Sequence, residues 1–130
     1  MNYSLNILAA PYSGQSADSA FMFAEAALSR GHNISRIFFF HEGIYNGNDL
    51  SLPPQDETNK VDRWKSMATE HSIDLVLCIA SALKRGVLDK AEADRAEKNN
   101  HNSEQPFALS GLGQLIDACT VSDRVITFGR

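Results

Sequence analysis

The chain alternates between short apolar runs and longer segments in which apolar residues recur at helical spacing. Phe38, Phe39 and Phe40 follow one another in one of these runs, which predicts a strand buried on both faces, as in a parallel sheet. Four runs are typical of buried β-strands: 4–10, 34–40, 73–79 and 123–128.

Helical patterns fill most of the remaining chain. From Ser16 onward apolar residues recur at i, i+3, i+4, i+7 and i+11, and Gly31 stands where a helix commonly ends. Two segments rich in Gly, Asn, Asp and Pro or in polar residues, 41–58 and 98–106, are predicted to be loops. Further helices are predicted over 59–71, around 89–97 and over 111–122.

Alternation of strands and helices predicts an α/β fold. At 130 residues we expect one compact domain, 1–130, with a mainly parallel sheet of about five strands and helices on both faces. In such sheets the working side chains gather at the carboxyl ends of the strands. Residues that follow a predicted strand are therefore the first candidates for chemistry.

Charge and the first residues narrow the classes of function. The net charge of −4 argues against direct binding of tRNA or other nucleic acid, which normally needs a basic face. The first ten residues lack a basic segment, and their apolar run is too short for a signal peptide or a membrane span. We therefore expect a cytoplasmic protein without a membrane segment, whose two cysteines are reduced thiols.

Cys78 stands at the junction of two patterns in the stretch "DLVLCIASALKRG" (74–86). A strand pattern precedes it, and small residues typical of a helix start follow it. The free N–H groups at a helix start favour a thiolate, and Lys84 and Arg85 would add positive potential. The alternative is an inert core thiol, because free cysteine is among the most buried residue types.

The second cysteine fits a structural role better. Cys119 completes a stripe with Leu112, Leu115 and Ile116, so the pattern predicts a core thiol. The chain contains no C-x-x-C pair of the kind used by dithiol oxidoreductases.

The histidines and the first turn give weaker signals. His32 and His71 lie at predicted helix ends, which favours structural roles, and the four histidines lack metal-ligand spacing. His41 and His101 lie in the long loops and could approach Cys78, although solvated loop positions are favoured. The segment "PYSGQS" (11–16) stands where flavodoxin-like proteins bind phosphate, but it lacks the glycine and lysine signatures, so a plain turn is favoured.

Several blocks resemble the DsrE/TusD family of sulfur-relay proteins, and TusD sulfurtransferase subunits in particular. These blocks are "SADSAFMFAEAALSRGH", "FFFHEGIYNGN", "CIASALKRG", "SGLGQL" and "DRVITFG"; they follow the family's order and cover nearly the whole chain. The resemblance implies a compact α/β domain whose Cys78 carries sulfur as a persulfide, with no metal or organic cofactor. The segment 93–106 departs from the family pattern more than its flanks do.

The resemblance also implies partners. TusD-like chains form a heterohexamer with TusC-like and TusB-like subunits, receive sulfur from a TusA-like donor and pass it to a TusE-like acceptor. That relay ends in 2-thiouridine at the tRNA wobble position, whereas DsrE works in sulfur oxidation. Both branches share these motifs, so both functions stay open. Ile44, Tyr45, Leu50 and Leu52 in the 41–58 segment form a possible interface.

Two further functions stay open at this point. One is a non-catalytic, flavodoxin-like binding module in which Cys78 is structural. The other is a small electron carrier that binds a flavin at "PYSGQS". An unreactive Cys78 would favour the first, and flavin absorbance of the purified protein would favour the second.

Overall fold

The computed structural model describes residues 1–130 and contains one five-stranded sheet with the strand order β4-β3-β2-β1-β5. Every neighbouring pair is parallel, which confirms the predicted α/β class and makes the sheet parallel throughout. The strands are β1 (Asn2–Ile7), β2 (Asn33–Phe39), β3 (Asp74–Cys78), β4 (Phe107–Ser110) and β5 (Arg124–Phe128).

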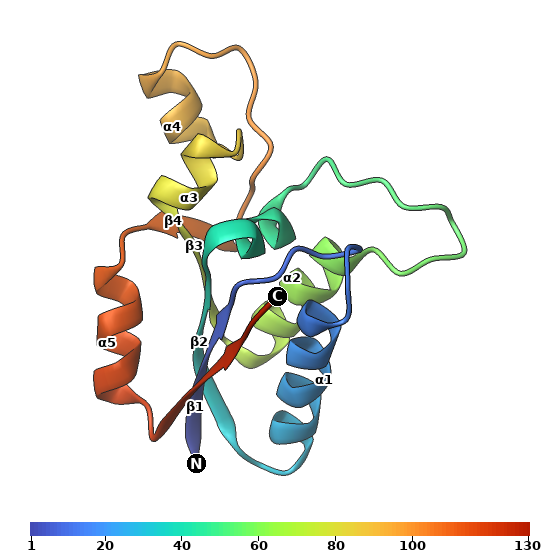
Figure 1. Ribbon diagram of the computed structural model, residues 1–130, viewed down its shortest axis with the longest axis vertical. Helices are drawn as coiled ribbons and strands as arrows, with labels where there is room; N and C mark the ends of the chain where they lie inside the picture. Colours follow the sequence, from blue (N-terminus) through green and yellow to red (C-terminus); the bar gives the residue numbers. More distant parts are fainter.

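Helices cover both faces, as the sequence predicts. Figure 1 shows α1 and α2 on one face of the sheet and α5 on the other, with α3 and α4 beyond the end where the strands finish. No helix is long and apolar enough to cross a membrane. The helices are α1 (Ser16–Ser29), the 3-10 helix η1 (His41–Gly47), α2 (Lys60–His71), α3 (Ile79–Lys84), α4 (Lys90–Arg95) and α5 (Gly113–Val121).

The core lies on both sides of the central strands. Successive residues of a strand point to opposite faces, yet Ile37, Phe38 and Phe39 of β2 are all fully buried. On the α2 side, Phe39 packs edge-on against Trp64, with 5.6 Å between ring centroids. The phenylalanine run therefore marks a two-sided buried strand, as predicted.

Helix ends follow local rules of chain chemistry. Gly31 takes a φ of +83° just after α1, a left-handed conformation that costs glycine little. At the start of α2 the side chain of Asn59 accepts hydrogen bonds from the N–H groups of Val61 and Asp62. Gly31 thus ends α1 before β2, and Asn59 begins α2 before β3.

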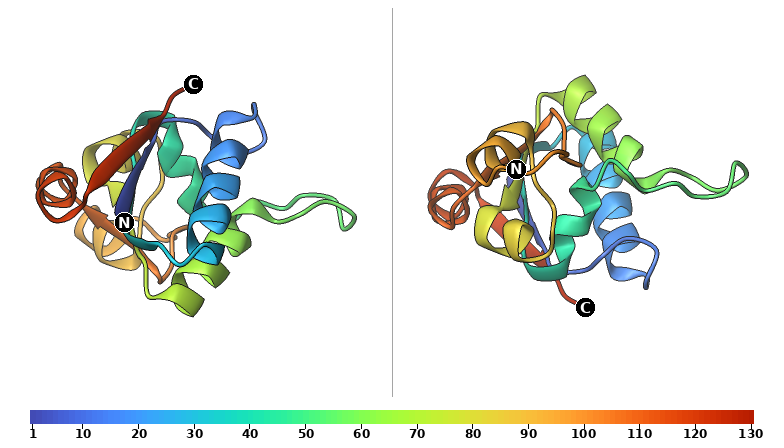
Figure 2. Two further views of the ribbon diagram at one scale, coloured as in Figure 1. Left: turned by 90° about the horizontal axis from the view of Figure 1, so that it is seen from below. Right: turned by 90° about the horizontal axis from the view of Figure 1, so that it is seen from above.

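Two segments differ from the sequence prediction. Residues 41–58 are not one loop, because 41–47 form η1; only 48–59 is irregular, and Figure 2 shows it extending away from the body. The strand β4 has no counterpart among the four runs identified in the sequence. It has only four residues, and its Ala108 is exposed, so it lacks a long apolar run.

Candidate active site

Cys78 is the last residue of β3 and the N-cap of α3, which confirms its predicted place between a strand and a helix. Across the sheet it pairs with Ser110 at the end of β4. Its side chain is buried, with only 3% of the residue exposed, and the sulfur makes no hydrogen bond within the chain. The thiol thus lies under the surface at the carboxyl end of a central strand.

The exposed residues nearest to Cys78 in sequence and register lie in α3 and directly after β4. Ala80, two residues after Cys78, is exposed, and Gly111, Leu112 and Gly113 directly follow Ser110 and are exposed as well. Neither glycine has a positive φ, and a methyl group on either would meet no other atom within 4 Å. This short, uncrowded loop borders the strand end that holds Cys78.

The helix η1 covers the other side of the site. The N–H of His41 donates a hydrogen bond of 3.2 Å to the Ser81 hydroxyl of α3. The imidazole of His41 is stacked on Phe40, with 4.1 Å between centroids, and makes no hydrogen bond with Cys78. The sequence allows His41 to approach Cys78. In the structure only the backbone of His41 lies close to α3, and its ring stays at the surface. His101 pairs with Glu104 at 2.6 Å instead.

A buried asparagine anchors η1. Asn46 is fully buried, and its side-chain NH₂ donates to the carbonyl groups of Ala9 and Gly43 at 3.0 and 2.8 Å. Its side-chain oxygen accepts the indole N–H of Trp64 at 3.1 Å. All polar groups of the Asn46 amide are thus engaged, and η1 is fixed to the segment that follows β1 and to α2. Sequence reasoning missed this network, because its one local signal, the Asn-Gly pair, is equally typical of a turn.

The basic residues of α3 lie at its far end. Lys84 is the last residue of the helix, and the guanidinium of Arg85 folds back to the carbonyl of Ser81 at 3.2 Å. Positive charge at a helix carboxyl end compensates the helix dipole there. No contact between either basic side chain and Cys78 supports the prediction that Lys84 and Arg85 add positive potential at the thiol.

The remaining candidates are structural. The ring of His32 bonds the terminal amine of Met1 at 2.8 Å, and His71 ends α2, as expected for these two histidines. No three metal-ligating side chains come together. Residues 11–15 form a turn before α1, and the carboxylate of Glu42, paired with Arg130 at 3.4 Å, borders it. The charges of Glu42 and Arg130 offset each other, so this pair gives the turn no net positive charge for a phosphate.

The prediction that Cys119 is a core thiol is wrong. This cysteine is exposed, not in the core. In α5 the side that packs on the sheet carries Ala118, fully buried, and Leu115, partly buried. Leu112 and Ile116 are exposed together with Cys119. The four apolar residues predicted to share one buried stripe therefore divide between two faces of the helix.

Two side chains have shifted pKa values, Asp18 of α1 and Arg36 of β2, and neither contacts Cys78. Burial opposes the charge of Arg36, but hydrogen bonds and charges of Asp117 and Asp74 prevail and raise the pKa of Arg36. Its ion pairs, 2.9 and 3.2 Å long, join α5 to β2 and β3. This cluster holds the sheet and α5 together and has no role at the thiol.

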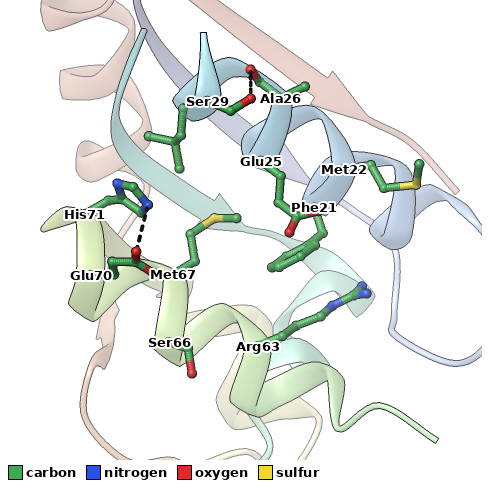
Figure 3. Close-up of a pocket in the computed structure, with 11 residues that line it drawn as sticks. Phe21, Met22, Glu25, Ala26, Ser29, Arg63, Ser66, Met67, Glu70 and His71 are labelled. Atoms are coloured by element: carbon green, nitrogen blue, oxygen red, sulfur yellow. Dashed lines mark hydrogen bonds and ion pairs between the residues drawn. The ribbon is translucent and has the colours of Figure 1, made fainter. Parts of the chain in front are cut away.

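A groove between α1 and α2 lies on the face of the sheet that these helices cover. Figure 3 shows Phe21 of α1 facing Arg63 and Met67 of α2, with Glu70 beside His71. Arg63 lies over the Phe21 ring at 4.4 Å. Cys78 does not line this groove.

The features described so far define a parallel α/β protein with a cysteine buried at a strand-to-helix junction. The chain matches the model of the DsrE/DsrF-like family over residues 1–128, and it belongs to that family. It is 44% identical to the putative sulfurtransferase DsrE of Allochromatium vinosum over 129 residues, 99% of each chain. It is 42% identical to the sulfurtransferase TusD of Photorhabdus laumondii over 128 residues, 98% of each chain.

A solved structure has the same fold. The ychN protein of E. coli superposes with a TM-score of 0.71 at 17% identity, covering 98% of this chain and 100% of that one. The curated relatives carry the argument about activity: similarity to sulfurtransferases over almost the whole length identifies the chain as an enzyme of the sulfurtransferase class.

Proposed function

We propose that Cys78 carries sulfur as a persulfide and passes it between carrier proteins. The observation that carries this proposal is the position of Cys78 at the end of β3 and at the N-cap of α3, in a chain similar to sulfurtransferases. A helix start favours the thiolate, and the thiolate is the nucleophilic form of cysteine.

The proposed chemistry is an exchange between sulfur atoms. The Cys78 thiolate attacks the outer sulfur of a donor R–S–SH, the bond between the two donor sulfurs breaks, and its electron pair leaves on the donor thiolate. The product is Cys78–S–SH. An acceptor thiolate then attacks the outer sulfur, and the Cys78 thiolate leaves. Neither step needs an external oxidant or reductant, because sulfur moves between equivalent positions.

Burial of Cys78 suits a carrier. At 3% exposure the thiol is shielded from stray thiols, and the exposed residues that border it in sequence and register, Ala80 and the 111–113 loop, are the proposed side of approach for a donor. The alternative of a structural Cys78 in a binding module rests on the same burial. Reactivity of the thiol toward a persulfide donor distinguishes the two.

We further propose that the relay leads toward 2-thiouridine at the tRNA wobble position, from a TusA-like donor to a TusE-like acceptor, in the cytoplasm. Similarity to TusD supports this pathway. Similarity to DsrE supports a second candidate, sulfur oxidation. Neighbouring genes separate the two: TusC-like and TusB-like frames alone favour tRNA thiolation, and sulfite-reductase subunits beside them favour oxidation.

The chain has exposed apolar side chains that suit assembly with TusC-like and TusB-like subunits in a heterohexamer. On α5, Ile116 is 67% exposed. The only charged residue of this helix, Asp117, is paired with Arg36. In the 48–59 loop, Leu52 is 93% exposed. Ile44, offered by the sequence as part of the interface, is instead fully buried. The α5 face and the tip of the 48–59 loop are therefore the proposed contact surfaces.

The test compares two serine variants with the wild type. Each protein is incubated with a cysteine desulfurase, cysteine and a TusA-like donor, and its mass is measured without reductant. One added sulfur is expected on the wild type and on Cys119→Ser, and none on Cys78→Ser. Because Cys119 is exposed, its replacement serves as a matched control that leaves the core intact. Sulfur retained on Cys78→Ser would exclude the proposed role, and flavin absorbance would favour the electron carrier.

A further inference from the structure

Ser81 is a buried hydroxyl in the first turn of α3, three residues after Cys78. It is 5% exposed. Cys78 is the N-cap and Ser81 the third residue of the helix, and side chains at these two positions are neighbours at a helix start. The place resembles that of a capping box, in which the third residue reaches back toward the cap.

The hydroxyl of Ser81 uses only part of its hydrogen-bonding capacity. Its oxygen accepts the N–H of His41. Its O–H donates to no carbonyl, carboxylate or other acceptor of the chain, whereas Ser29 and Thr120 in longer helices each donate to a backbone carbonyl of the preceding turn. A buried donor without an acceptor is costly, so an acceptor that forms at this place is stabilised.

The sulfur of Cys78 is a neighbouring group that makes no hydrogen bond at the start of α3. We propose that the O–H of Ser81 donates a hydrogen bond to the Cys78 sulfur when that sulfur is an anion. This inference rests on the proposed function, because the anion is the nucleophile of the loading step and the leaving group of the unloading step. The bond requires a change of χ1 rotamer at Cys78 or Ser81, because Cys78 makes no capping hydrogen bond in this structure.

The titratable and hydroxyl side chains on η1 and β4 beside α3 are less buried than Ser81. The titratable groups on η1 are His41, Glu42 and Tyr45; the ring of His41 is stacked on Phe40, and Glu42 pairs with Arg130. Strand β4 carries no titratable side chain, and the hydroxyl residue that pairs with Cys78, Ser110, is only partly buried. Within α3 itself, Lys84 and Arg85 lie at the opposite end. Ser81 is thus the buried side-chain donor placed closest to the sulfur along the chain.

The experiment measures the rate of Cys78 alkylation by iodoacetamide between pH 5 and pH 10. Cys119→Ser is the background, so that a single thiol reacts. Removing a hydrogen bond to a charged group corresponds to roughly a tenfold change, so Ser81→Ala should react about tenfold more slowly at pH 7. The midpoint of the profile should move to higher pH, and the plateau at high pH should stay at the value of the background protein. Ser81→Thr, which keeps the hydroxyl, should restore the profile.

A purely structural role of Ser81, through its bond to His41, predicts a different alkylation profile. If Ser81 served only to hold η1 in place, Ser81→Ala would change the plateau through access and leave the midpoint unmoved. Ser4→Ala is the matched control, because it removes a buried hydroxyl whose partner is Ser122, at 2.6 Å, on the segment before β5. This variant should leave the alkylation profile unchanged.

An unmoved midpoint in Ser81→Ala, or a shift that Ser81→Thr does not restore, overturns the inference. These outcomes are independent of sulfur loading, because alkylation needs no persulfide donor. A wild type that fails to take up sulfur while Ser81→Ala shifts the alkylation profile would refute the proposed function and leave the role of Ser81 in place.

Discussion

Replacing Gly43 by alanine tests how η1 is fixed over the site. A methyl group at Gly43 would overlap the carbonyl oxygen of Ile7, and it would lie 2.9 Å from the carbonyl carbon of Ile7 and 3.5 Å from that of Leu8. Carbon atoms in contact are ordinarily about 3.5–4.0 Å apart. The obstructing atoms belong to the backbone at the end of β1 and cannot rotate away. Helix η1 must therefore move outward by roughly 1 Å.

The movement has a cost that the structure allows us to estimate. Overpacking against a rigid wall costs about 1–3 kcal/mol. Moving η1 also weakens the hydrogen bonds of Asn46 to Ala9 and Trp64, at about 1 kcal/mol each. We expect a total of about 4 kcal/mol, which lowers the melting temperature of a domain of this size by about 15 °C.

Thermal unfolding followed by circular dichroism measures the effect. Gly14→Ala is the matched control, because a methyl group there meets no atom within 4 Å and the φ of Gly14 is not positive. It should melt within a few degrees of the wild type. If Gly43→Ala melted together with Gly14→Ala and the wild type, the close approach of η1 to β1 and the account of its fixation would be wrong.

Three further predictions concern charge and surface. Burial opposes ionisation of Asp18, but Lys60 and Arg63 prevail and lower its pKa, so the stability that this carboxylate contributes is present above about pH 4 and is lost as the pH falls further. Asp18→Asn should cost on the order of 1 kcal/mol at pH 7 and close to nothing at pH 3 in urea titrations; an equal cost at both would contradict this. Ile116→Asp should leave the melting temperature of the isolated chain almost unchanged and reduce the complex with the neighbouring gene products in sedimentation. With a net charge of −4 the chain alone should not retain tRNA in filter binding at physiological salt, and submicromolar affinity would refute that expectation.

The sequence predicts the strand-to-helix junction at Cys78 because that junction is a local event. The apolar residues before Cys78 and the small residues after it specify the strand and the helix start without help from distant parts of the chain. The end of α1 at Gly31 and the apolar face of α2 follow from local patterns for the same reason. Val61, Trp64 and Met67 on that face are all buried.

The parts that the sequence does not predict depend on distant contacts. Helix η1 is held by the bond between Asn46 and Trp64, eighteen residues apart, and its composition alone resembles a loop. Strand β4 is too short to give a pattern of its own and forms because β3 offers an edge. The apolar residues of α5 cover two faces, and periodicity does not tell which face meets the sheet; hence the wrong placement of Cys119.

The central claim is that Cys78 accepts sulfur and passes it on, and a single-turnover chase tests it most directly. Protein with the Cys119→Ser change is loaded with radiolabelled sulfur from a persulfide donor, separated from the donor and mixed with an acceptor protein that has one reactive cysteine. We expect one labelled sulfur per chain on the peptide that contains Cys78, and we expect that label to disappear at the rate at which the acceptor becomes labelled. Label that never enters this peptide, or that enters it and cannot be moved to any thiol acceptor, would contradict the claim.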